Sequence, residues 1–144
     1  MSKENLFLEH RCPISARLAI FEDDGKSAWL YLCEPESQKP IADGWVYNRI
    51  EAPSRESVQQ FRGGPPPAAE GFAGETAWCE TPSDYEWSFI WSTDGTAVAL
   101  CCDGVPTTMI VVGERRGFSR RLAKDGPWGH PWSESMFQRM FAAK

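Results

Sequence analysis

Apolar residues in this chain fall into short runs that have the length of β-strands rather than of helices. The clearest runs lie at 17–21, 27–33, 44–50, 87–91, 96–101 and 107–112. They are rich in β-branched and aromatic residues, which pack well on a pleated surface and therefore favour strands. The pattern predicts a protein built mainly from antiparallel β-sheet.

The dipeptide Asp-Gly marks the expected turns and accounts for five of the twelve glycines. Both residues tolerate the positive φ angles of tight hairpin turns, and glycine does so without steric cost. Three of these dipeptides, at Asp24-Gly25, Asp94-Gly95 and Asp103-Gly104, stand between strand-like runs. A fourth, Asp43-Gly44, opens the run 44–50 and is also expected to be a turn.

These elements predict one α+β domain over residues 1–144, with about six strands in two meanders. The first meander is expected at 14–50 and the second at 85–124. The hairpin sequence at 21–29 resembles that at 91–98, so an internal duplication is one interpretation. The other interpretation is that hairpins with Asp-Gly turns look alike.

The region 51–84 joins the two meanders and has a different character. Residues 54–61 could form a short helix, whereas 63–69 reads Gly-Gly-Pro-Pro-Pro-Ala-Ala and cannot be regular structure, because proline lacks a backbone donor. We therefore expect a long surface loop over residues 62–83. Loops of this length in compact domains are often functional or else disordered.

The C-terminal region, 132–143, predicts an amphipathic helix. Ser133 can cap it, and Met136, Phe137, Met140 and Phe141 fall on one face. That face is expected to pack on the sheet.

Both faces of the first predicted hairpin are apolar. Pairing across the turn would place Leu18, Ile20, Leu30 and Leu32 on one face, and Ala19, Phe21, Trp29 and Tyr31 on the other. Either both faces are buried, which is the commoner case, or the aromatic face is a binding surface. In the second case a pocket would be lined by Phe21, Trp29, Tyr31, Trp45 and Tyr47.

Candidate chemistry is sparse. The five cysteines are odd in number and form no C-x-x-C, and the two histidines are far apart, so neither a disulfide framework nor a metal site is expected. No nucleophile or phosphate-binding motif is present, so we expect neither a catalytic residue nor a cofactor. A secretory signal and a membrane-spanning run are also missing, which favours the cytoplasm.

Charge is distributed unevenly along the chain, whose formal net charge is −5. No lysine or arginine occurs between Arg62 and Arg115, and carboxylates alternate there with aromatic residues. A negative surface with aromatic anchors suits the capture of a basic protein. The expected partner-binding residues are Glu70, Glu75, Trp78, Glu80, Asp84, Tyr85, Glu86 and Trp87.

A basic strip follows at 115–121, with four arginines around Phe118. It could contact phosphates, with the phenyl ring stacking on a base. The acidic chain as a whole argues against nucleic acid, and a charged edge strand explains the same residues better.

The hairpin Phe21–Gly25 with the aromatic strand residues Trp29–Tyr31, and more loosely Trp91–Gly95, resembles an uncharacterised family of small bacterial domains. It is also similar in style to immunity proteins, which neutralise polymorphic toxins such as those delivered by type VI secretion. The resemblance implies a non-enzymatic protein that occludes a cognate toxin, and it carries over no active site. A small enzyme or ligand-binding domain using the aromatic pocket is the alternative, and a homodimer through an aromatic face is also open.

Overall fold

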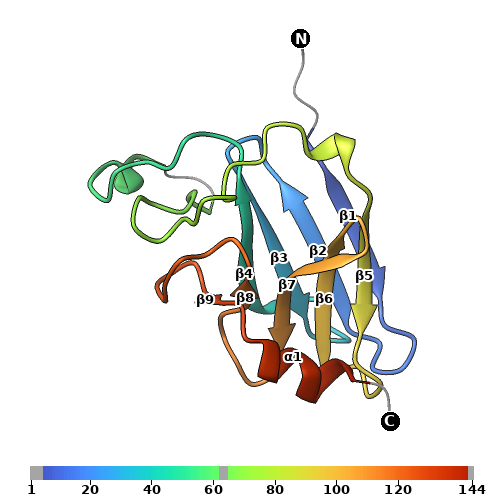
Figure 1. The fold of residues 1–144 in the computed structure, drawn as a ribbon. Helices are drawn as coiled ribbons and strands as arrows, with labels where there is room; N and C mark the ends of the chain where they lie inside the picture. The colour runs from blue at the N-terminus through green and yellow to red at the C-terminus, as the bar shows by residue number, and fades with distance from the viewer. Residues whose placement is uncertain (1–4, 62–64, 143–144) are drawn as a thin grey trace.

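The computed structural model describes residues 5–61 and 65–142 and shows two β-sheets with one C-terminal helix (Figure 1). The elements are β1 (Phe7–Arg11), β2 (Leu18–Asp23), β3 (Ser27–Cys33), β4 (Pro40–Asn48), the 3-10 helices η1 (Ser57–Gln60) and η2 (Pro82–Asp84), β5 (Trp87–Trp91), β6 (Ala97–Cys102), β7 (Val105–Val111), β8 (Phe118–Ser119), β9 (His130–Pro131) and α1 (Glu134–Phe141).

Each sheet is a run of neighbouring strands in sequence order. The first sheet has the order β1-β2-β3-β4 and the second β5-β6-β7-β8-β9. The prediction of an α+β fold with antiparallel sheets and a C-terminal helix is therefore confirmed. The order of strands is consistent with two meanders, except that β9 pairs parallel with β8, and the described residues form nine strands rather than six. The missed strands are the short pair β8 and β9, and β1, whose sequence Phe-Leu-Glu-His-Arg is mostly polar because it lies at a sheet edge.

Asp-Gly forms the predicted turns at three places. At β6–β7, Asp103 and Gly104 have φ angles of 51° and 82°, the two positive values that a tight hairpin turn needs. The prediction of a turn at Asp43-Gly44 is wrong, because both residues lie inside β4. Glycine is needed there for a different reason: a Cβ on Gly44 would lie 3.2 Å from the Cα of Gly117.

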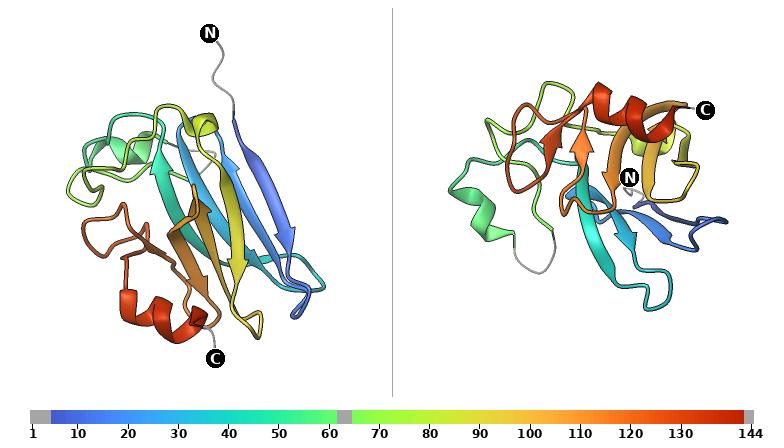
Figure 2. Two further views of the ribbon diagram at one scale, coloured as in Figure 1. Left: turned by 45° about the vertical axis from the view of Figure 1, so that its right-hand side comes forward. Right: turned by 90° about the horizontal axis from the view of Figure 1, so that it is seen from below.

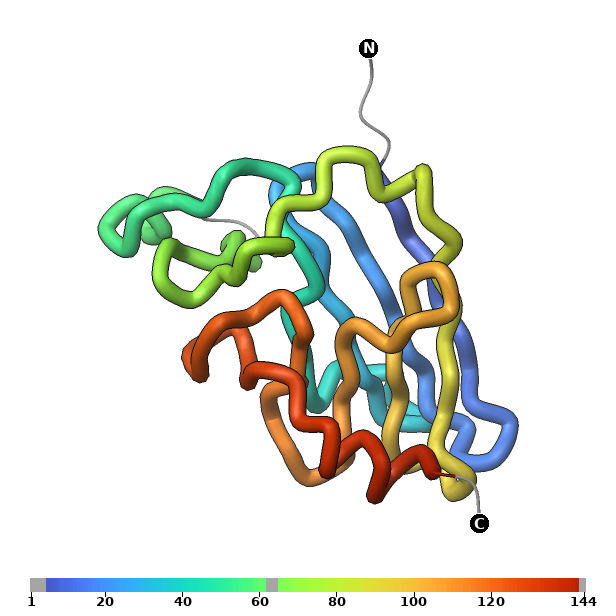
Figure 3. The backbone as a smooth tube through the Cα atoms, viewed as in Figure 1, coloured from blue at the N-terminus to red at the C-terminus, as the bar shows by residue number. Residues whose placement is uncertain are grey.

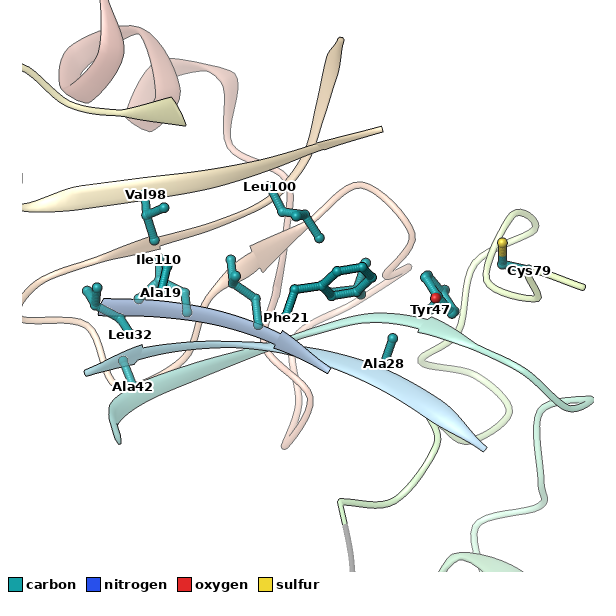
Figure 4. Packing of buried hydrophobic residues seen from close by; sticks show 12 residues of the cluster. Ala19, Phe21, Ala28, Leu32, Ala42, Tyr47, Cys79, Val98, Leu100 and Ile110 are labelled. Carbon is teal, nitrogen blue, oxygen red and sulfur yellow. The ribbon is translucent and has the colours of Figure 1, made fainter. Parts of the chain in front are cut away.

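The two sheets pack face to face around the main core (Figures 2 and 4). Ala19, Phe21, Leu30 and Leu32 of the first sheet meet Val98, Leu100 and Ile110 of the second. This corrects the predicted faces of the first hairpin. Asp23 pairs with Ala28, and by the same register Phe21 lies opposite Leu30, on the same face.

The opposite face of the first sheet is buried too. Trp29 and Trp45 point to this side, where they pack with Ala68, Ala69 and Trp128. A bulge between β3 and β4 beside Trp29 interrupts the alternation of side chains between the two faces of the sheet. Tyr47 therefore points to the core between the sheets, whereas Trp45 points to the opposite face. Part of the predicted surface loop is therefore a cover for the sheet. Residues 62–64 of that loop lie outside the described residues.

Asn48, at the end of β4, holds this cover in place. Its side-chain oxygen accepts hydrogen bonds from the backbone N–H of Ala68 at 2.8 Å and from Nε1 of Trp45 at 2.9 Å, and its amide nitrogen donates to the carbonyl of Ala68 at 3.0 Å. Its backbone bonds to Ala77 and Cys79. One fully buried residue thus ties β4 to two parts of the connecting segment, through its side chain at Ala68 and through its backbone at Ala77 and Cys79.

The helix α1 begins after Ser133, whose hydroxyl accepts from the Met136 N–H at 3.2 Å, as predicted. It lies over the outer face of the second sheet (Figures 1 and 2). It is shorter than the predicted 132–143, of which residue 143 is outside the described part. None of its residues is fully buried, so the helix is a partial cover.

We expect Asn48→Ala to lower the free energy of unfolding by about 3 kcal/mol, because three buried polar groups lose their partner. Denaturant unfolding followed by tryptophan fluorescence measures this. Gln60→Ala, at an exposed position, is the matched control and should change stability by less than about 0.5 kcal/mol. Equal stability of the two variants would show that Asn48 does not anchor the segment.

Candidate functional site

The carboxylates between Glu70 and Glu114 are all exposed. None of them takes part in a salt bridge within residues 5–61 and 65–142, where the ion pairs are Arg49–Asp23, Arg120–Glu134 and His130–Asp125. Their charge is therefore left uncompensated by close contacts, as a surface for a basic partner requires.

Three of the predicted partner-binding residues gather around one cleft. Glu70, Glu75 and Trp78, with small residues of the 71–77 loop, line a hollow of about 390 Å³. The Trp78 side chain is 52% exposed, which is unusual for so large an apolar group. Nearby Arg55 stacks over Phe72 at 5.4 Å and is not part of the lining. The cleft is therefore lined by two carboxylates and an indole, with the Arg55 guanidinium beside its Gly71.

The other predicted residues follow along the chain toward β5. Glu80, Asp84 and Glu86 are exposed, and Tyr85 is 42% exposed. Trp87 differs, because its ring lies 5.0 Å from Phe21 and its Nε1 donates to the Pro82 carbonyl at 2.9 Å. Trp87 is therefore part of the core packing rather than of the surface.

The alternative pocket in the first half is not assembled. Phe21 and Tyr47 lie in the inner core, whereas Trp29, Tyr31 and Trp45 belong to the cluster on the opposite face of the sheet. The backbone of the first sheet separates the two groups, and four of the five side chains are buried. The aromatic residues of this half serve packing.

A buried polar network was not predicted from the sequence. Asp23 accepts from Nη1 of Arg49 at 2.7 Å and from the Tyr47 hydroxyl at 2.7 Å, with the two charged side chains almost fully buried. Burial, together with the Asp23 carboxylate, raises the pKa of Tyr47. In the sequence Asp23 is one of three consecutive acidic residues, Glu22-Asp23-Asp24, and only its place on the inner face distinguishes it from the other two. We assign the network to holding the end of the sandwich together.

The basic strip 115–121 joins the two sheets. Gly117 donates to the carbonyl of Asp43 at 2.7 Å, and Asp43 donates to the carbonyl of Arg115 at 3.2 Å. The prediction of an edge strand here is wrong, since β8 lies between β7 and β9. Asp43, Arg115, Arg116 and Pro127 line a hollow of about 300 Å³. Burial raises the pKa of Asp43, and the two arginines oppose the shift.

The two histidines lie in different surroundings. His10 accepts from Nε1 of Trp91 at 2.9 Å, and His130 contacts Asp125 at 2.7 Å. The described residues contain no group of His, Cys, Asp and Glu that could hold a metal ion. The five cysteines are free thiols. No helix in the described ranges is both long and apolar enough to cross a membrane.

Replacing the two tryptophans one at a time should separate surface from core. Trp78→Ala is expected to change the free energy of unfolding by less than about 0.5 kcal/mol, because the ring is largely exposed. Trp87→Ala should cost about 3 kcal/mol, because it leaves a cavity beside Phe21 and Tyr47. Thermal or denaturant unfolding measures both, and a large loss for Trp78 would place it in the core instead.

Asp43 should make stability depend on pH. Its pKa is raised in the fold, so the folded protein holds this proton more tightly than the unfolded chain does. The free energy of unfolding then falls as pH rises from the ordinary carboxyl pKa of 3.8 through the raised value. Asp43→Asn should gain stability relative to the parent over that window and keep the gain at neutral pH. Unfolding at a series of pH values tests this, and a gain that shrinks with rising pH would contradict it.

No family model, no curated protein and no solved structure matches this chain. The function is therefore inferred from the surface and the interior of the molecule itself.

Proposed function

We propose that this chain is a non-enzymatic binding protein that captures a basic protein partner. The binding residues are those of the acidic aromatic surface, which we define as Glu70, Glu75, Trp78, Glu80, Asp84, Tyr85 and Glu86. The observation that carries the proposal is the exposure of Trp78 and Tyr85, 52% and 42%, among carboxylates that form no ion pair in the described part of the chain.

Each part of this surface has a physical role. The unpaired carboxylates attract a cationic partner over distances near the Debye length, which raises the rate of encounter. Trp78 and Tyr85 supply large apolar contact area that becomes buried in a complex, and such residues dominate interface energies. The cleft beside Trp78 can receive a long side chain such as lysine or arginine, whose charge would meet Glu70 and Glu75.

The form of this function that we favour is an immunity protein, which binds a bacterial toxin and covers its working surface. It is supported by the resemblance of Phe21–Gly25 and Trp29–Tyr31, and by an acidic surface that complements the basic surface of a toxin acting on nucleic acid. The aromatic pocket of the alternative, ligand-binding function loses its basis, because its five residues lie on two sides of a sheet.

The partner can be found by purifying the chain from its own host cells together with whatever it binds, then producing that protein pure. We expect a basic protein, and we expect Glu80→Lys, Asp84→Lys and Glu86→Lys together to weaken its binding by about 100-fold. If the partner is a toxin, cells making the triple variant should lose protection against it.

A control variant with the same total charge distinguishes binding through the proposed surface from an effect of net charge alone. Glu36→Lys, Glu56→Lys and Glu114→Lys are exposed positions off the proposed surface. Three reversals add six charges in either variant, so both move from −5 to +1. The control should retain affinity within about threefold. Equal weakening by both variants, or an acidic partner, would overturn the proposal.

A further inference from the structure

Strand β5 forms one edge of the second sheet, with β6 as its only neighbour in that sheet. The pairing between them is regular. Two backbone hydrogen bonds show which residues face β6 with their bonding groups: the N–H of Ser92 donates to the carbonyl of Ala97, and the N–H of Asp103 donates to the carbonyl of Glu86. In an antiparallel ladder, bonded and non-bonded pairs alternate. Ser88 and Ile90 therefore direct their backbone groups toward β6, whereas Trp87, Phe89 and Trp91 direct theirs outward.

The outward row of backbone groups has no hydrogen-bond partner among the described residues. The sequence of β5, Trp-Ser-Phe-Ile-Trp, contains no charge and no proline, and its ladder has no bulge. Charges, prolines and bulges are the features that usually keep an exposed edge strand from pairing with another chain, and β5 has none of them. Ile90 adds an apolar contact area beside this edge, because its side chain is 38% exposed on the outer face.

The other sheet edges are better protected. The edge of β4 is occupied, since its backbone bonds to Ala77, Arg115, Gly117 and Trp128. The edge of β1 lies beside β5 on the open side of the molecule (Figure 3), where His10 bonds to Trp91, but β1 carries Glu9, His10 and Arg11. The fourth edge strand, β9, is two residues long and includes Pro131, so the open, uncharged edge is that of β5.

The surroundings of β5 are acidic. Asp84 and Glu86 precede the strand, Asp94 follows it, and Asp103 lies beside its first residue. Arg11, at the end of β1, donates to the carbonyls of Ala16 and Pro35. An extended segment that pairs with β5 would thus be surrounded by negative charge.

We propose that the partner adds an extended, basic strand to the free edge of β5. This inference rests on the proposed function and specifies how the partner is held. Backbone hydrogen bonds between the partner strand and Trp87, Phe89 and Trp91 set the register. Alternate apolar side chains of the partner strand lie along the aromatic residues and Ile90. Its lysine or arginine side chains meet the carboxylates at both ends of β5.

A second copy of this chain fits the same edge poorly. A two-fold antiparallel pair centred on Phe89 would place Trp87 opposite Trp91 of the copy, and would bring Asp84 and Glu86, before the strand, toward Asp94 of the copy, after it. Like charges then meet at both ends of the added ladder, which destabilises the pairing. Charge complementarity thus favours a basic strand over self-association.

The test uses the full chain and a seven-residue peptide of alternating lysine and valine with blocked ends. We expect the peptide to bind and to slow hydrogen exchange of the backbone amides of Trp87, Phe89 and Trp91 by about tenfold or more at saturation. The amides of Ser88 and Ile90 are already paired with β6 and should not change. The measurement is amide exchange followed by NMR.

Two control peptides isolate the cause. The same peptide methylated on every backbone nitrogen keeps its charge and side chains but cannot donate, and should bind at least about tenfold more weakly. A peptide of alternating glutamate and valine keeps the backbone but reverses the charge, and should not bind measurably.

The outcomes distinguish this inference from the proposed function. Binding of the basic peptide without protection of the three outward amides, or equally tight binding of its methylated form, would overturn strand addition and leave capture by the acidic aromatic surface standing. Protection that appears without peptide and grows with protein concentration would assign the edge to a second copy. Failure of the basic peptide to bind at millimolar concentration would also overturn strand addition, while the co-purified partner tests the proposed function separately.

Discussion

The first sheet must be buried on both faces, and most of the structure follows from this constraint. On one side Phe21, Leu30 and Leu32 require an apolar partner, which is the second sheet. On the other side Trp29 and Trp45 require a cover, which comes from residues 65–77 and from the segment around Trp128. Asn48 fixes the position of the covering segment at Ala68, since burying a polar amide is favourable only when its hydrogen-bonding groups find partners.

The sandwich is closed along one side and open along the other. At the closed side, Gly44 and Gly117 allow β4 and the chain after β7 to approach closely enough for backbone bonds between the two sheets. At the open side, β1 and β5 meet only through side chains such as His10 and Trp91. The unused backbone groups of an edge strand, β5, therefore lie at the open side.

The aromatic residues divide between two tasks according to where the chain places them. Trp87, Phe89 and Trp91 pack inward, whereas Trp78 and Tyr85, from the irregular segment before β5, remain exposed beside carboxylates. Exposure of such rings costs free energy that a monomer does not recover. That cost, together with the unpaired charge, is the physical basis on which we propose this surface for binding.

The sequence by itself determined much of the local structure: the six strands β2 to β7, the Asp-Gly turns at 24, 94 and 103, the helix cap at Ser133 and the acidic stretch. Each of these depends on neighbours a few residues apart. The tertiary structure alone decided which face Phe21 occupies, why Asp43-Gly44 is a strand, and that Trp87 is core while Trp78 is surface. It also brought Asp23, Tyr47 and Arg49 together and left β5 at an edge. These features depend on turn length, a bulge and contacts between distant segments, which no local pattern of residues records.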